Sequence, residues 1–150
     1  MLQSLKAFLA EFTAADDKAA TTEDDLRLAA AALMFHVIAV DGTVSPEERL
    51  LLGDLLRERF QLDPQETREL LAAAENAEAE AVDLFHFTSV LKQRLDAADR
   101  ERIIAMMWKL VFADGKLHEF EDNVVWRAAE LLGVSNQARI RLKQAARDPG

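Results

Sequence analysis

The chain of 150 residues is 50% hydrophobic, which is enough to bury the core of one globular domain and excludes a disordered protein. It contains no cysteine, so disulfides, thiolate zinc sites and cysteine nucleophiles are excluded, and we expect a reducing compartment, the cytoplasm. The formal net charge of -9 repels phosphate backbones, so we expect no nucleic-acid partner.

The amino-terminal part predicts two helices and no membrane span. Apolar residues recur at helical spacing over residues 2–13, without the long apolar centre or cleavage site of a signal peptide. Thr22 and Asp25 have the spacing of a cap before a second helix, residues 23–40, which is apolar almost all round and should be central. Its longest apolar run, residues 28–40, is shorter than the ~20 residues that cross a bilayer, so we expect no membrane insertion.

Strong helix-start signals follow. Ser45 can cap a helix, Pro46 fits the first helical position and Glu48 can reach back to the cap, which predicts a third helix over residues 46–60. The remaining helices are predicted over residues 64–76, 84–95, 97–113, 119–132 and 136–147, with a connector at 77–83. Capping residues precede four of them: Asp63, Asp83, Asp96 and Ser135. Gly133 should end the helix that precedes it.

One short motif occurs twice. The pair Asp41 and Gly42 recurs as Asp114 and Gly115, 73 residues later. The same offset aligns apolar and acidic positions on both sides of the pair: Leu33 with Met106, Phe35 with Trp108, Val44 with Leu117, and Glu48 with Glu121. We interpret this pattern as an internal duplication of a three-helix unit around an Asp-Gly turn.

The duplication and the helix pattern together predict the fold. The two units cover about residues 23–76 and 97–147, and no segment alternates with the period of a strand. Neither unit is large enough for a core of its own, so we expect one domain over residues 1–150. The predicted fold is all-α, a bundle of about eight helices.

Each turn matches only half of the EF-hand calcium loop. Placing Gly42 or Gly115 at position six of that twelve-residue loop puts Glu48 or Glu121 at position twelve, as calcium binding requires. Positions one and three are apolar in both copies and cannot coordinate a hard cation: Val37, Ala39, Leu110 and Phe112. We therefore expect no conventional EF-hand site.

The turns nevertheless bring four acids to equivalent positions: Asp41, Glu48, Asp114 and Glu121. In one interpretation they are helix caps, with Ser45 as the partner of one glutamate and His118 as the partner of the other. In the other interpretation the two turns meet and form an acidic pocket that needs a cation. Turns at opposite ends of the fold would instead give two weak, hydrated sites.

Other candidates for chemistry are weaker. His36 and His86 lie in apolar helices and should be core histidines with satisfied hydrogen bonds, and His118 should be exposed. Trp108 and Trp126 should be core residues, and we find no catalytic motif, so we expect no enzyme. Four basic residues near the end of the last helix should serve the helix dipole: Arg139, Arg141, Lys143 and Arg147.

The chain resembles a known family in three stretches. AVDGTVSPEE at residues 39–48, VDLFHFTSVL at 82–91 and ADGKLHEFEDNVVWRAAELLGV at 113–134 are similar to the TerB-like tellurite-resistance proteins, particularly the short bacterial members. The similarity extends over about residues 25–145, and its most specific part is residues 111–134.

The resemblance implies an internally duplicated helical bundle with a non-catalytic, accessory role in the response to tellurite and other chemical stress. It implies binding of a divalent metal ion (calcium, magnesium, manganese or zinc) through acids that here correspond to Asp41, Glu48, Asp114 and Glu121. It also implies docking onto other proteins, some of them associated with membranes. The two sites need not be equivalent, because Ser45-Pro46 in the first turn corresponds to His118-Glu119 in the second.

A second function remains open: a metal-free scaffold for protein–protein interaction, in which the acids are only helix caps. That function predicts no effect of metal ions and an exposed apolar patch where a partner docks. The sequence also leaves a homodimer open, since the apolar first helix could pack on a neighbouring copy.

Overall fold

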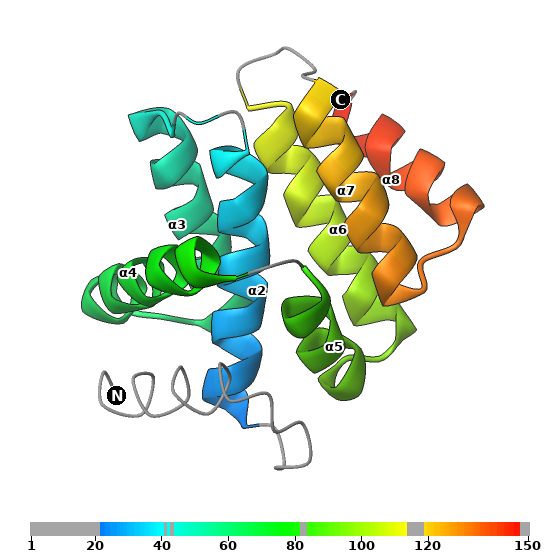
Figure 1. The fold of residues 1–150 in the computed structure, drawn as a ribbon. Helices are drawn as coiled ribbons and strands as arrows, with labels where there is room; N and C mark the ends of the chain where they lie inside the picture. The colour runs from blue at the N-terminus through cyan, green and yellow to red at the C-terminus, as the bar shows by residue number, and fades with distance from the viewer. Residues whose placement is uncertain (1–21, 41, 43, 82–83, 114–118, 148–150) are drawn as a thin grey trace.

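The computed structural model describes residues 22–40, 42, 44–81, 84–113 and 119–147. The elements formed by these residues are all helices: α2 (Glu23–Ala39), α3 (Pro46–Phe60), α4 (Pro64–Glu80), α5 (Phe85–Arg94), α6 (Ala97–Val111), α7 (Glu119–Leu132) and α8 (Asn136–Arg147). The all-α prediction is therefore confirmed for the described part of the chain (Figure 1). The first predicted helix, residues 2–13, lies outside it.

The helix α2 lies at the centre of the fold. Residues on all of its faces are buried, including the run of four alanines at 29–32 and the larger Leu33, Met34 and Phe35. The small alanine side chains let neighbouring helices approach closely, and α2 packs against α3, α4, α5, α6 and α7. An α-helix that is apolar all round is stable only when other elements surround it, as the sequence predicted for this segment.

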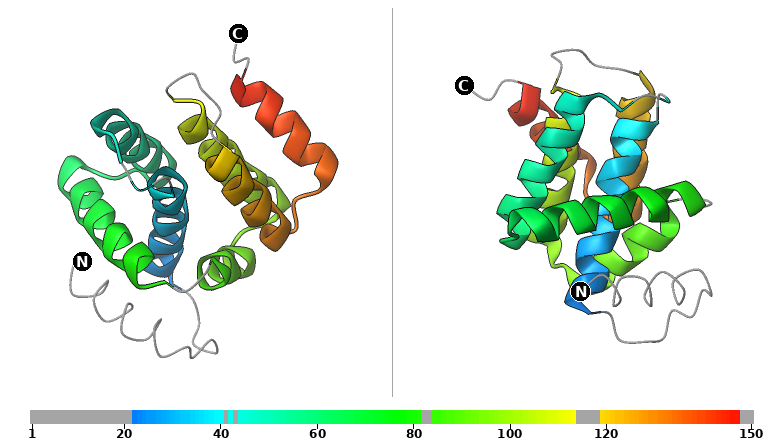
Figure 2. Two further views of the ribbon diagram at one scale, coloured as in Figure 1. Left: turned by 45° about the horizontal axis from the view of Figure 1, so that its top comes forward. Right: turned by 90° about the vertical axis from the view of Figure 1, so that its left-hand side faces the viewer.

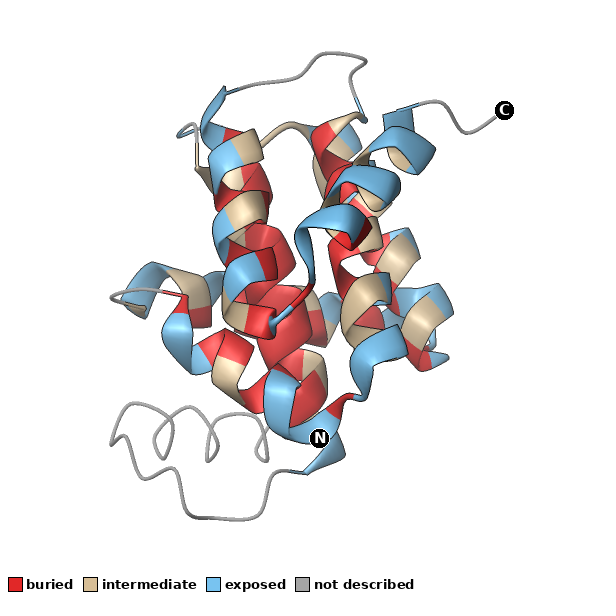
Figure 3. Cartoon of the chain, turned by 90° about the vertical axis from the view of Figure 1, so that its right-hand side faces the viewer, coloured by how far each residue is buried: buried red, intermediate tan, exposed pale blue. Residues whose placement is uncertain are grey.

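The helices form two groups of three with α5 between them. One group contains α2, α3 and α4, and the other contains α6, α7 and α8 (Figure 2). The helix α5 packs on α2 and on α7, so it bridges the groups. Buried residues gather where the helices face one another, and exposed residues lie on the outer faces (Figure 3).

Capping boxes begin three of the helices, as their sequences predict. Thr22 Oγ1 accepts a hydrogen bond from the Asp25 amide at 3.1 Å, and an Asp25 carboxylate oxygen accepts one from the Thr22 amide at 2.8 Å. The same reciprocal pair of bonds joins Asp63 and Glu66 at the start of α4. Each box satisfies two amide groups that a helix leaves without an internal acceptor.

Two helices end in a left-handed residue. Gly133 follows α7 with φ 76°, and Gln61 follows α3 with φ 56°. The next amide in each case bonds back to a helical carbonyl, from Val134 to Ala129 at 2.9 Å and from Leu62 to Arg57 at 3.2 Å. Gly133 therefore ends α7 as predicted, and Gln61 ends α3 in the same way without glycine.

Three predicted boundaries differ. The helix α4 continues to Glu80, so residues 77–80 are helical and were wrongly predicted as connector. Its extension buries Ala77 and consists of helix formers without glycine or proline. The helix α6 ends at Val111, before the predicted residue 113, and α5 begins at Phe85 without a side-chain cap on its backbone. The predicted cap, Asp83, lies outside the described residues.

Replacing Gly133 with alanine should destabilise the protein by about 1 kcal/mol, because a residue with a Cβ pays that much to adopt a left-handed backbone. No atom lies within 4 Å of the position that the new Cβ would occupy, so the cost is conformational and not steric. Urea unfolding measures the change. Gly53→Ala is the matched control: its new methyl group would lie 3.5 Å from Leu71 and Thr67, in ordinary contact, and in mid-helix should be neutral or stabilising. Equal losses in the two variants would contradict this account.

Candidate functional site

The two acidic turns are flanked by helix ends that lie at one end of the molecule. The first turn follows the end of α2 and precedes α3, and the second follows the end of α6 and precedes α7. All four helix ends lie at the top of Figure 1, and the side view in Figure 2 agrees. Helix ends that lie together in this way are a condition for a shared acidic site.

Of the four predicted acids, Glu48 and Glu121 lie within the described residues. Asp41 and Asp114 lie outside them, as does Gly115. Gly42 is described: it has φ 89° and its amide bonds to the Ala39 carbonyl at 3.0 Å. Gly42 therefore supplies a left-handed residue just after the end of α2.

Glu48 completes the capping box of α3. Its carboxylate accepts a hydrogen bond from the Ser45 amide at 2.9 Å, and its own amide donates one to the Ser45 hydroxyl at 3.1 Å. The side chain is half-buried. Its bond to the amide uses Oε1, and Oε2 makes no hydrogen bond to the residues that the structure describes. The capping interpretation is thus confirmed for Glu48, and one oxygen of its carboxylate remains for another ligand.

Glu121 occupies a different environment although it is the counterpart of Glu48 in the sequence. Only 1% of its surface is exposed, at a position in the first turn of α7. A carboxylate withdrawn from water to this extent must be compensated by hydrogen bonds, by a cation or by protonation. Glu119 in the same turn adds further negative charge, whereas Asp122 is paired with Lys143. The sequence offset identified the position but gave no sign of its burial.

No group of three or more histidine, aspartate or glutamate residues within the described ranges could hold a metal ion. Glu48 and Glu121 supply carboxylate oxygens, which suit hard divalent cations. A complete ligand set at this end of the molecule therefore depends on Asp41 and Asp114.

Two of the three histidines lie within the described residues. His36 Nδ1 lies 2.9 Å from a carboxylate oxygen of Glu78 and joins α2 to α4, with 30% of its side chain exposed. It is hydrogen-bonded, as predicted, but it lies at the edge of the core. His86 is exposed, so its prediction as a core residue was wrong, because it lies on the outer face of the bridging helix α5. His118 lies outside the described residues.

In each group of three helices, a cationic side chain contacts both an aromatic ring and a carboxylate. In the first group, Arg49 of α3 bonds to Glu75 of α4 at 2.8 Å, and its guanidinium carbon lies 5.6 Å from the centre of the Phe35 ring on α2. In the second, Lys143 of α8 bonds to Asp122 of α7 at 2.9 Å and lies 5.2 Å from the centre of a ring on α6, that of Trp108. We call these two arrangements the Arg49 clasp and the Lys143 clasp.

The clasps were not predicted, although the sequence contains a signal. The offset of 73 residues pairs Phe35 with Trp108, and it also pairs Arg49 with Asp122, so the charge at that position is reversed. The reversed charge predicts a reversed ion pair only if the third helix of each group, α4 or α8, places a side chain of the opposite charge within contact distance. That distance depends on how α4 and α8 pack, which the sequence pattern does not specify.

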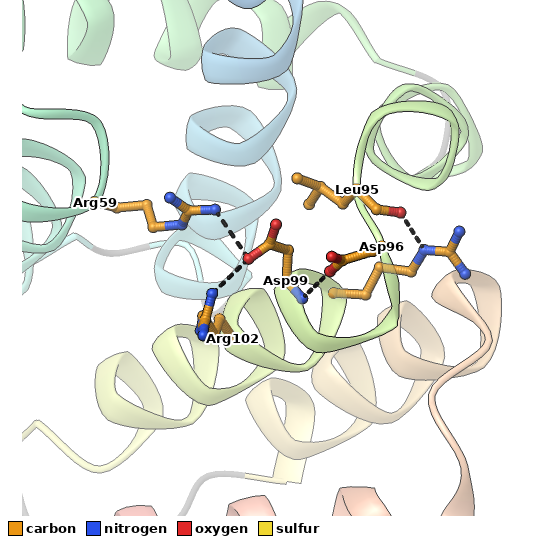
Figure 4. A network of polar contacts seen from close by, with 6 residues as sticks. Arg59, Leu95, Asp96, Asp99 and Arg102 are labelled. Carbon is orange, nitrogen blue, oxygen red and sulfur yellow. Dashed lines mark hydrogen bonds and ion pairs between the residues drawn. The ribbon is translucent and has the colours of Figure 1, made fainter.

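A further network joins the two groups away from the acidic turns. Asp99, near the start of α6, accepts a hydrogen bond from Arg102 at 2.7 Å and lies 3.4 Å from an Arg59 nitrogen at the end of α3 (Figure 4). The Asp99 amide donates to the Asp96 carboxylate at 2.8 Å, which confirms Asp96 as the cap of α6. This network has a structural role, since it fixes the end of α3 against the start of α6.

The predictions for the tryptophans and the basic cluster need correction in part. Trp108 is fully buried, as predicted, whereas Trp126 is only half-buried. The dipole prediction was wrong for Arg139, Arg141 and Lys143, because Arg147 is the basic residue in the last turn of α8. Each of the three instead contacts an aromatic ring or a carboxylate on α6 or α7.

Ser45→Ala should destabilise the protein by about 1 kcal/mol, because it removes the acceptor for an amide in the first turn of α3. Glu48→Gln should cost less than about 0.5 kcal/mol, because glutamine can take the same place in a capping box. Chemical unfolding in chelated buffer measures both, with the exposed neighbour Glu47→Gln as control. A large loss for Glu48→Gln in the absence of metal would show that this carboxylate does more than cap.

Comparison with known proteins identified one matching protein family. The family model described as tellurite resistance protein TerB matches residues 27–144, which span α3 to α7 entirely and most of α2 and α8. No match was found among curated proteins or among solved structures. Among the helices of the described ranges, none has the length and apolar character needed to cross a membrane. Since the match covers more than three quarters of the sequence, the chain belongs to the TerB family of tellurite resistance proteins.

Proposed function

We propose that the chain is a non-catalytic accessory protein of the cytoplasm, linked to tellurite and chemical stress, that binds a divalent cation at the end of the bundle where the acidic turns lie. The observation that carries the proposal is the position of the four helix ends that flank these turns, all at one end of the molecule. Membership of the TerB family supports the link to tellurite resistance.

The ligands would come from both turns. Asp41 and Glu48 belong to the first turn, and Asp114 and Glu121 to the second. Glu48 has one carboxylate oxygen engaged in its cap and the other available. A cation beside Glu121 would reduce the repulsion between this carboxylate and the neighbouring Glu119. Calcium, magnesium, manganese and zinc all accept such oxygen ligands.

The proposal includes an internal duplication, which would place the two sets of ligands in related positions. The helix α3 begins at Pro46, directly after its cap Ser45. The helix α7 begins at Glu119, which the same offset of 73 residues pairs with Pro46. The left-handed ends of α3 and α7 and the two clasps occupy corresponding places in the two groups of helices. These parallels support two copies of one three-helix unit.

The test is thermal unfolding of chelator-treated protein with added calcium, magnesium, manganese or zinc. One of these ions should raise the melting temperature in a saturable way, because a ligand of the native state stabilises it by about 2.7 kcal/mol at a hundredfold excess over Kd. The double variant Glu48→Gln/Glu121→Gln should lose the rise, as should Asp41→Asn/Asp114→Asn.

The matched control is Glu47→Gln/Glu119→Gln, which removes two exposed carboxylates from the same first turns of α3 and α7. It should keep the rise. If it loses the rise as well, the ion acts through net charge and not at a site. No rise in the wild type at millimolar ion would mean that the acids are helix caps.

The second candidate is a metal-free scaffold that docks onto other proteins, including ones associated with membranes. Two observations favour it. Glu48 makes both bonds of a capping box, and two large apolar side chains near the acidic turns are exposed, Leu50 on α3 at 70% and Phe120 on α7 at 66%. The thermal test separates the two candidates, and sedimentation of the chain alone would show whether it forms a homodimer.

A further inference from the structure

The helix α8 is packed far less tightly than its counterpart α4. The helix α4 buries five side chains, whereas Ala138 is the one residue of α8 that is buried. Ile140 in the middle of α8 is 48% exposed, and Leu142 and Ala146 are only partly covered. Apolar burial is the main source of helix docking, so α8 must depend on other contacts.

Those contacts are made by cations. Arg141 bonds to Glu101 on α6 at 2.9 Å, and Lys143 bonds to Asp122 on α7 at 2.9 Å. The side chains of the first pair are 63% and 34% exposed, and those of the second are 24% and 22% exposed. Solvent screens the first pair strongly, so Lys143 is the principal anchor.

Two cations of α8 also lie over the two tryptophans of the chain. Lys143 lies 5.2 Å from the centre of the Trp108 ring, and Arg139 lies 5.3 Å from that of Trp126. A cation over an indole ring is a favourable contact that does not need a precise apolar fit.

The surface beneath α8 has a defined chemistry. It presents two indole rings from Trp108 and Trp126 and two carboxylates from Glu101 and Asp122. The indole nitrogen of Trp108 is buried and has no hydrogen-bond partner among the residues that the structure describes. A helix that complements it needs lysine or arginine side chains and a narrow apolar stripe.

We propose that α8 is a displaceable strap and that the surface beneath it binds a basic amphipathic helix of a partner protein. In the free protein α8 occupies this surface and keeps Trp108 fully buried. A partner helix with better apolar contacts displaces α8 by meeting the same carboxylates and rings. The surface does not require a metal ion, so it is independent of the proposed cation site.

The first test follows α8 in the full chain by hydrogen exchange and tryptophan emission. In Lys143→Met, which removes the partly buried ion pair with Asp122, the amides of α8 should lose protection about tenfold while those of α4 keep it. Tryptophan emission should shift to longer wavelength. Salt at about 1 M should reduce the protection of wild-type α8 less than this substitution does, because a partly buried pair is only weakly screened. Arg49→Met, which opens the clasp of the other group, should leave α8 protected.

The second test asks whether the uncovered surface binds a basic helix. In Arg141→Glu/Lys143→Glu, α8 faces Glu101 and Asp122 with like charges and should leave the surface. A synthetic peptide with the wild-type sequence of residues 134–147 should then bind and return the tryptophan emission to that of the wild-type protein. A peptide with both charge reversals should not bind.

Three results would overturn the proposal. The first is protection of α8 that Lys143→Met does not reduce. The second is simultaneous loss of protection in α4 and α8, which would mean global unfolding. The third is a charge-reversed variant that stays folded by circular dichroism, loses the cover on its tryptophans and fails to bind the wild-type peptide.

Discussion

The burial of α2 on all sides is the constraint on which the rest of the structure depends. A helix whose residues 28–35 are apolar without interruption has no face that can meet water, so other helices must enclose it. Its alanines let those helices come close, and its polar side chains are confined to its ends, where Asp25 caps the start and His36 bonds to Glu78. The order of packing around α2 then determines which other segments meet.

Enclosing α2 also places the candidate site. Because α3, α6 and α7 all pack on or beside α2, the end of α2, the start of α3, the end of α6 and the start of α7 lie at one end of the bundle. The Asp99 network joins α3 to α6 at their opposite ends, so polar contacts as well as the core connect the two groups of helices. The common position of the four helix ends is thus a consequence of the packing, and the chemistry of Glu48 and Glu121 beside them depends on how far each carboxylate is buried.

Local signals predicted what is determined locally. Capping boxes at Thr22, Ser45 and Asp63 and the glycine at 133 gave the correct limits of several helices, since each depends on bonds within about four residues. Predictions from the sequence were wrong where tertiary contacts determine a helix boundary or the exposure of a side chain. The continuation of α4 to Glu80 depends on burial of Ala77, and the exposure of His86 depends on which face of α5 points outward.

The same limit applies to the candidate site. The offset of 73 residues identified Glu48 and Glu121 as counterparts, and one of them is half-buried while the other is buried. Burial at the start of a helix depends on the neighbouring helices, which a repeat in the sequence does not describe. The two clasps escaped prediction for a related reason, because each joins three helices.

The opposite polarity of the two clasps has a consequence for how the chain folds. Two similar groups of helices in one chain carry the risk that the third helices, α4 and α8, dock on the wrong group. Such an exchange would place Lys143 against Arg49 and Glu75 against Asp122, two contacts between like charges in place of two ion pairs. The opposite polarity of the clasps therefore disfavours docking of either third helix on the wrong group.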